Sequence, residues 1–194
     1  MNARAIILAA GRGSRMGALG GERPKCLVEV GGRTLLQRQL DALRSCGIAD
    51  IAIVSGYRRT MVALPGVVEF HNERWAETSM VSSLACASDW LREAKCIVSY
   101  ADIFYETAAV QSLLDCRVPL AITYSAHWRA LWACRFDDPL SDAETFRLHA
   151  DGTLAEIGGN PVSLEAIEGQ YMGLLGFEPA GWSEVERIRD ALPP

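Results

Sequence analysis

Residues 5–17 read "AIILAAGRGSRMG", and this stretch decides how the rest of the sequence is interpreted. Its first half is a short apolar run that ends at Gly11, which predicts a buried β-strand. Two glycines and two arginines follow within residues 11–15. Glycine permits positive φ angles and close backbone approach, so successive N–H groups can point into one concavity and bind an anion. The loop therefore indicates a dinucleotide site, a triphosphate site, or a simple turn with solvated arginines.

The residues after the loop weigh against a dinucleotide. Such a site needs a helix to start at once, with its N-terminus facing the pyrophosphate. Residues 16–25 instead read "MGALGGERPK", whose three glycines and one proline favour a loop. Glu29 lies near the position of the ribose-binding acid, but the missing helix outweighs it. Arg12, Arg15 and Lys25 suit three phosphates, and no G-K-[ST] follows that would make a Walker loop.

Apolar segments alternate with amphipathic ones up to Ser125, and the alternation then breaks. Asp151-Gly152 lies between two strand-like runs and is a strong hairpin signal. We predict an α/β fold with a doubly wound, mostly parallel sheet in a single domain 1–194, carrying an antiparallel β-hairpin insertion at about 126–160. The expected elements are strands at 50–57, 67–70, 96–102, 118–125 and 169–177, and helices at 34–47, 78–94, 106–115 and 179–192.

The composition argues against several classes of protein. The chain has 194 residues, 49% of them hydrophobic, and a net charge of −5, which fits one soluble domain and disfavours a general nucleic-acid surface. No run approaches the ~20 apolar residues that a membrane span needs. The six cysteines form no C-x-x-C pair, so they indicate neither a zinc ribbon nor a redox motif. We expect free thiols and a cytoplasmic location.

Two motifs at fixed spacing, and a strand that follows them, carry a family resemblance. The chain reads "LAAGRGSRMG" at 8–17, "RPKCLVEV" at 23–30 and "IAIVSGY" at 51–57. In this pattern it resembles the nucleotidyltransferases related to sugar-phosphate and choline-phosphate activating enzymes. The resemblance covers most of residues 4–125. It implies a Rossmann-like, three-layer fold that transfers a nucleotidyl group from a nucleoside triphosphate to a phosphate.

The resemblance also implies roles for residues of this chain. The glycine loop and the lysine after it are expected to contact the triphosphate, and the loop before the helix at 78–94 is expected to contact the base. Ser79 has an equally open interpretation as a helix cap. The catalytic residues are then Lys25, Arg15 and Asp102, and the nucleotide-binding residues Leu8, Ala9, Ala10, Gly11, Arg12, Gly13, Ser14, Asn72, Ser79, Ser83 and Ala101.

Asp102 follows a predicted parallel strand and is expected to hold a catalytic Mg²⁺. Mg²⁺ binds one or two carboxylates together with phosphate oxygens. The alternative role for Asp102 is to cap the helix that begins near Glu106. Related enzymes often supply a second carboxylate from a C-terminal "EVD"-like segment, whereas this sequence stops at "ALPP". Either the sequence is truncated or another acid serves, and we take Glu168 as the second ligand, with Asp142 and Glu144 as further candidates and surface acids as the alternative.

Residues 124–148 and 167–177 resemble a narrower group, the cytidylyltransferases that act on small phosphorylated alcohols, inositol phosphates and phosphonates. An arginine fork suits a phosphonate dianion and aromatic faces suit an alkylammonium. An equally open interpretation is that the tryptophans here bury a hairpin or a homodimer contact. The expected acceptor site comprises Trp128, Trp132, Arg135, Glu168 and Tyr171.

The resemblance predicts a Mg²⁺-dependent enzyme that transfers CMP from CTP to a small phosphate or phosphonate acceptor and releases pyrophosphate. We expect no nucleic-acid or membrane partner. Two alternatives stay open. One is a sugar-1-phosphate or molybdopterin-type nucleotidyltransferase that uses another nucleoside triphosphate. The other is a catalytically inactive nucleotide-binding domain.

Overall fold

The structure is a computed structural model that describes residues 3–13 and 23–192. The chain divides into two compact units. The core unit comprises residues 1–121 and 173–194, and the insertion unit comprises residues 122–172. None of the described helices combines the length and apolar character needed to cross a membrane.

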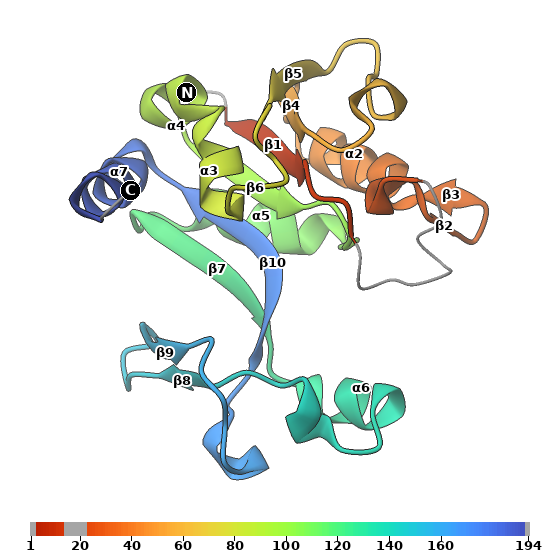
Figure 1. Ribbon diagram of the computed structural model, residues 1–194. Coiled ribbons are helices and arrows are strands. Elements are labelled where there is room, and N and C mark those ends of the chain that lie inside the picture. The colour runs from red at the N-terminus through yellow and green to blue at the C-terminus, as the bar shows by residue number, and fades with distance from the viewer. Residues whose placement is uncertain (1–2, 14–22, 193–194) are drawn as a thin grey trace. The chain divides into compact units, whose positions relative to one another are not determined.

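A six-stranded sheet organises the core unit (Figure 1). Strand β1 pairs in parallel with β4 and with β6, β4 pairs in parallel with β5, and β10 runs antiparallel to β6. This arrangement confirms the predicted α/β fold with a mostly parallel sheet. In spatial order the strands are β5 (Val68–His71), β4 (Ile51–Ser55), β1 (Arg4–Ala9), β6 (Cys96–Tyr100), β10 (Gln170–Phe177) and β7 (Leu120–Ser125).

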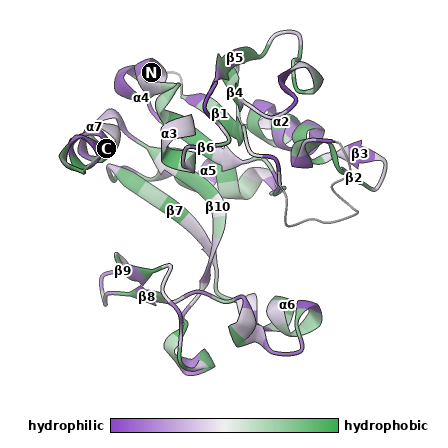
Figure 2. Ribbon diagram, in the orientation of Figure 1, coloured by the Kyte–Doolittle hydropathy of each residue, from purple (hydrophilic) through white to green (hydrophobic). Residues whose placement is uncertain are grey.

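Helices cover both faces of this sheet because the side chains of each strand alternate between the faces. On β1, Ile7 belongs to the hydrophobic cluster that includes α2 and α5, whereas Ile6 belongs to the cluster that includes α3, α4 and α7. The hydrophobic colouring of the central strands in Figure 2 follows this burial. The helices are α2 (Leu35–Ser45), α3 (Met80–Ala85), α4 (Ser88–Glu93), α5 (Thr107–Asp115) and α7 (Pro179–Ala191).

Helix α2 forms where the sequence predicts it. Thr34 accepts a hydrogen bond from the backbone N–H of Gln37, and the Gln37 side chain accepts one from the backbone of Thr34, which completes a capping box. The helix ends at a cap residue followed by Gly47, whose φ of +79° is a common way to stop a helix. A short antiparallel pair, β2 (Glu29–Val30) and β3 (Arg33–Thr34), leads into it.

The single helix predicted at 78–94 is two helices, α3 and α4. The hydroxyl of Ser88 donates a hydrogen bond to the carbonyl of Ala85, and Ala87 leaves helical geometry at φ −105° and ψ 20°. A serine that bonds the neighbouring backbone competes with the regular helix pattern, and the helix breaks there. The N-cap of α3 is Ser79, whose hydroxyl oxygen accepts a hydrogen bond from the backbone N–H of Ser82.

The insertion unit has a hydrophobic core of its own. Strands β8 (Phe146–Leu148) and β9 (Leu154–Ile157) form the antiparallel hairpin predicted around Asp151-Gly152, where Gly152 has a φ of +82°. Helix α6 (Trp128–Arg135) was not expected from the sequence. The buried residues of its hydrophobic cluster are Trp128, Trp132, Ala143, Phe146 and Ile167.

Candidate active site

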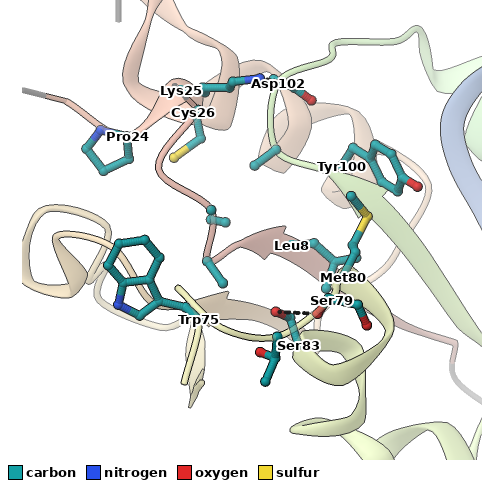
Figure 3. Close-up of a pocket in the computed structure, with 16 residues that line it drawn as sticks. Leu8, Pro24, Lys25, Cys26, Trp75, Ser79, Met80, Ser83, Tyr100 and Asp102 are labelled. Carbon is teal, nitrogen blue, oxygen red and sulfur yellow. Dashed lines mark hydrogen bonds and ion pairs between the residues drawn. The ribbon is translucent and has the colours of Figure 1, made fainter. Parts of the chain in front are cut away.

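A cavity of about 330 Å³ lies in the core unit, where β1 and β6 end (Figure 3). Ligands of open α/β sheets bind at the carboxyl ends of the strands. Two segments that are distant in the sequence, the glycine loop after β1 and the turn after β6, therefore share this cavity. The site residues expected from the sequence that line it are Leu8, Ala9, Ala10, Gly11, Gly13, Lys25, Ser79, Ser83, Ala101 and Asp102.

Gly13 cannot be replaced by another residue without strain. Its φ is +71°, and a Cβ at this position would lie 2.5 Å from the side chain of Lys25. The lysine therefore passes directly over the glycine backbone on its way into the cavity. Arg12 is exposed, and its guanidinium lies 5.8 Å from the ring centre of Tyr57. Ser14 and Arg15 lie outside the described residues.

Lys25 and Asp102 meet in the cavity. The Lys25 Nζ lies 2.7 Å from Oδ2 of Asp102, although 77 positions separate the two residues in the sequence. Figure 3 shows the two side chains together, with Trp75 across the cavity from them. Both are partly exposed, and an ion pair of that kind adds at most about 1 kcal/mol to stability. The cap of α5 is Glu106, so the alternative role of Asp102 as a helix cap is wrong.

Asn72 stabilises the loop that forms the cavity wall opposite Lys25 and Asp102. Its side chain is buried, and its Nδ2 donates to Thr78 Oγ1 and to Ser83 Oγ, both at 2.9 Å. Its Oδ1 accepts from the backbone N–H of Arg74. These bonds join residues of the loop to one another and to α3, so the side chain of Asn72 shapes the cavity wall. Ser79, which also caps α3, lines the cavity together with Ser83.

Sequence reasoning missed several residues of the cavity wall. The clearest is Trp75, whose ring packs edge-on against Tyr57 at 5.4 Å between centres. Gly56 allows Trp75 to lie close to the backbone, because a Cβ at position 56 would lie 2.6 Å from both the Trp75 side chain and the Ala10 carbonyl oxygen. A tryptophan in a polar loop between a strand and a helix was the available signal. The other missed residues are Pro24, Cys26, Thr78, Met80 and Tyr100.

Cys26 lines the cavity but is chemically quiet. Burial raises the pKa of its thiol to about 12. A thiol with that pKa carries almost no thiolate at neutral pH, and the thiolate is the nucleophilic form. The cavity therefore offers cation and carboxylate groups rather than an activated cysteine.

Asp102 is the carboxylate among the residues that line the described cavity. In the described part of the chain no three His, Cys, Asp or Glu side chains gather in a way that could hold a metal ion. Mg²⁺ does not require such a cage, since it is usually bound by one or two carboxylates together with substrate phosphates and water. A single carboxylate beside a glycine loop fits a metal ion that arrives with its nucleotide.

The residues expected at the acceptor site lie in the insertion unit. Trp128 and Trp132 are buried, and their ring N–H groups donate to the carbonyl of Ile167 and to Oδ2 of Asp142. This burial favours the packing interpretation for the two rings, and their acceptor role stays a prediction. Arg135 is exposed, and its guanidinium lies 4.9 Å from the ring centre of Trp132.

Glu168 and Tyr171 complete this predicted set. Glu168 is exposed, and its Oε2 accepts from the backbone N–H of Leu148 at 2.6 Å, which ties it to the hairpin. Tyr171 packs against the hydrophobic core of the insertion unit. The role of Glu168 as a second metal ligand also stays a prediction.

The fold and the cavity together define an α/β protein with a charged site at the carboxyl edge of a mostly parallel sheet. The sheet ends in a glycine loop, and a lysine and an aspartate project into the cavity from the segments beside it. The family model described as MobA-like NTP transferase domain matches residues 5–162, and the chain belongs to that family. It is thus a nucleotidyltransferase by family.

Relatives extend the match over most of the chain. The sequence is 38% identical over 195 residues to a CTP:phosphoglutamine cytidylyltransferase from Campylobacter jejuni, a match that covers 93% of this chain and 75% of that protein. It is 33% identical over 104 residues to a 2-aminoethylphosphonate cytidylyltransferase from Lancefieldella rimae, covering 51% of this chain and 42% of the relative.

Solved structures share the fold. The CTP:phosphocholine cytidylyltransferase of Streptococcus pneumoniae (LicC) matches with a TM-score of 0.72 and 20% identity, over 98% of this chain and 77% of that one. The inositol-1-phosphate CTP transferase of T. maritima matches with a TM-score of 0.73 and 19% identity, over 95% and 74% of the two chains. At this identity the structures establish the architecture.

Proposed function

We propose that the protein is a cytidylyltransferase that moves CMP from CTP to a small phosphate- or phosphonate-bearing acceptor and releases pyrophosphate. The supporting observation is the convergence of Lys25 and Asp102 on one cavity beside the glycine loop. The similarity to a CTP:phosphoglutamine cytidylyltransferase over 93% of the chain supports CTP as the donor. It also makes phosphoglutamine the first acceptor to test.

The transfer needs no protein nucleophile. An oxygen of the acceptor phosphate attacks the α-phosphorus of CTP in line, the new O–P bond forms, and the bond from that phosphorus to the bridging oxygen of pyrophosphate breaks. The acceptor is largely anionic at neutral pH, so no protein base has to remove a proton. Catalysis then consists of positioning and charge stabilisation, as in phosphoryl transfer generally.

Lys25 supplies a compact positive charge. Its Nζ lies in the cavity beside the carboxylate of Asp102, and we place the α-phosphate of CTP next to this amine. Negative charge on the transferring group shifts during the displacement, and a fixed cation stabilises it. The backbone N–H groups of the glycine loop and Arg12 and Arg15 would bind the remaining phosphates. Asp102 would hold Mg²⁺, and the ion when bound would neutralise phosphate charge.

The walls of the cavity suit a nucleoside. Ser79 and Ser83 carry hydroxyls that can both donate and accept, which suits the edge of a pyrimidine. Trp75 offers an apolar surface on the same wall. We assign acceptor binding to the insertion unit, with the exposed Arg135 as the phosphate-binding residue.

Within the described residues all six cysteines are unpaired, in keeping with the expected cytoplasmic location.

The test is a pyrophosphate-release assay with purified protein and Mg²⁺. CTP, UTP, GTP, ATP and dTTP are each combined with phosphoglutamine, 2-aminoethylphosphonate, phosphocholine and inositol phosphate. We expect release with CTP and one of these acceptors, and at least tenfold less with the other nucleotides. Release with UTP or dTTP and a sugar 1-phosphate would replace the proposal with a sugar nucleotidyltransferase. CTP binding without release from any acceptor would favour an inactive nucleotide-binding domain.

A further inference from the structure

A buried glutamine lies beneath the turn that carries Asp102. Gln39 is on α2, and its side chain is completely buried. Its neighbours on the buried face of the helix are Leu36, Leu40 and Leu43, so the sequence pattern alone assigns the position to a hydrophobic core. Burying an amide among aliphatic side chains is unfavourable unless its polar atoms are hydrogen-bonded. The choice of glutamine here requires a reason other than packing.

The amide of Gln39 bridges two carbonyls on either side of Asp102. Its Nε2 donates to the carbonyl of Tyr100 at 2.8 Å and to the carbonyl of Ile103. Tyr100 is the last residue of β6, and Ile103 directly follows Asp102. The two bonds therefore fix the backbone of the turn at both ends. The hydroxyl of Ser99 also donates to the Tyr100 carbonyl, so the bond to Ile103 is what ties down the far end of the turn.

The oxygen of the Gln39 amide also indicates that the side chain is there to bond the turn. Among the described residues, Oε1 of Gln39 has no hydrogen-bond partner. Turning the amide over would place this oxygen against two carbonyl oxygens, so the network itself sets which atom is the donor. A methionine or leucine would fill a similar volume and carry no polar atom of its own to leave unpaired, but it would give up the two bonds to the turn. The glutamine is thus a poorer core residue than its neighbours and is explained by its two donated bonds.

We propose that Gln39 is a positioning residue for nucleotidyl transfer. By bonding both ends of the turn, it holds the Asp102 carboxylate at the point in the cavity where the divalent ion and the triphosphate are bound. This inference rests on the proposed function. Mutating a residue that orients a metal ligand typically lowers metal affinity or activity 10–100-fold, although that residue does not touch the metal. The expected effect is therefore measurable.

The experiment compares Gln39→Met with Leu40→Met, a conservative change in the buried face of the same helix. Binding of Mn²⁺ is measured by electron paramagnetic resonance with CTP present and no acceptor, so this readout needs no turnover. Thermal denaturation, kcat, and KM for CTP and for the acceptor are measured beside it. Gln39→Leu is a second apolar replacement, so the conclusion does not depend on the folding of one variant.

For Gln39→Met we expect about tenfold weaker Mn²⁺ binding and a similar loss in kcat, with an unchanged acceptor KM and a protein that stays folded at the assay temperature. Leu40→Met should match the parent in all of these. Unchanged Mn²⁺ affinity in Gln39→Met, or a loss that merely follows the unfolded fraction, overturns the inference.

Asp102→Ala separates this failure from a failure of the proposed function. Loss of Mn²⁺ binding in Asp102→Ala but not in Gln39→Met refutes the role of Gln39 alone. Retained binding in Asp102→Ala refutes the metal site itself, and with it the basis of the inference.

Discussion

The two units use aromatic side chains differently. In the insertion unit, Trp128, Trp132 and Phe146 make up much of the buried interior. In the core unit, the interior between the sheet and helices α2 and α5 is aliphatic, the opposite face buries Phe177 and Trp182, and Trp75 lies on the cavity wall. A small unit has little interior, so each buried side chain must remove a large area from water. The comparison teaches that a tryptophan in the smaller unit is explained first by folding, and one in a loop of the larger unit by the site.

The largest effect is expected at the cavity of the core unit. Lys25→Ala and Asp102→Ala should each reduce kcat by roughly 10²–10³-fold, since the first removes the cation expected at the reacting phosphate and the second removes the carboxylate expected to hold Mg²⁺. Because the pair is partly exposed, the Tm should change little. Pyrophosphate release and thermal denaturation measure the two effects.

Arg92→Ala is the matched control for these two variants. Arg92 is exposed and pairs with Glu186 on α7, so its removal also deletes an ion pair of the core unit. It should leave kcat at the parent value. A near-normal rate in Lys25→Ala or Asp102→Ala would show that the catalytic roles are wrongly assigned.

Trp128→Ala should separate stability from nucleotide binding. Removing this buried ring is expected to cost about 3–5 kcal/mol in the free energy of unfolding of the insertion unit. Because the cavity lies wholly in the core unit, the affinity for CTP should not change. Denaturant unfolding and calorimetric titration with CTP and Mg²⁺ test both statements. A stable variant with lost acceptor binding would instead make Trp128 a ligand contact.

Gly13→Ala should damage the cavity by geometry alone. The φ of +71° and the predicted contact of 2.5 Å with the Lys25 side chain force either the loop or the lysine to move. We expect a stability loss of about 1 kcal/mol and roughly tenfold weaker CTP binding. Gly66→Ala is the control, since Gly66 has a similar φ of +73° and open space around it. Equal CTP affinities in the two variants would exclude a special role for Gly13.

Arg135→Ala tests the insertion unit as the acceptor site. Loss of a charge-assisted hydrogen bond should raise the acceptor KM about tenfold and leave the KM for CTP unchanged. Arg129→Ala is the control, because Arg129 also packs its guanidinium over a tryptophan ring in the same unit. Equal acceptor KM values in the two variants would remove Arg135 from the site.

The smallest effect concerns the thiols. Burial raises the pKa values of Cys26 and Cys96 from 9.0 to about 12. The unfolded thiols ionise first, so their contribution to the free energy of unfolding is intact below pH 9 and falls as the pH rises toward 12. A Cys26→Ala, Cys96→Ala variant should show a shallower loss of stability over this range in denaturant titrations. An unchanged slope would mean that other groups determine the alkaline transition.

The sequence predicts elements well where the signals are local. Strand β1 and helix α2 of the core unit follow from neighbouring residues, and so does the turn at Asp151-Gly152 in the insertion unit. Helix α6 was missed because its buried tryptophans are spaced among charged and small residues, and their partners lie far along the chain. The break between α3 and α4 depends on one serine hydroxyl, which a periodicity argument does not register.

The residues of the site also divide into those with local sequence signals and those that depend on distant parts of the chain. The glycine loop and Lys25 could be identified from contiguous motifs, and Asp102 from its place after a strand. Trp75 reaches the cavity only because Gly56, distant in the sequence, leaves room for it. The sequence motifs do not single out Gln39, and its bonds to the turn after β6 appear only in the three-dimensional structure. Long-range hydrogen bonds of this kind leave no periodic signal in the sequence.

The route of the chain between the units has an evolutionary consequence. The chain leaves the core unit after residue 121 and returns at residue 173, on strands β7 and β10, which are neighbours in the sheet. A segment whose two ends are anchored on adjacent strands is easily exchanged, lengthened or shortened, because its replacement has only a short gap to close. Descendants of one ancestral gene can thereby acquire new segments at this place while the strands and loops around the cavity stay the same.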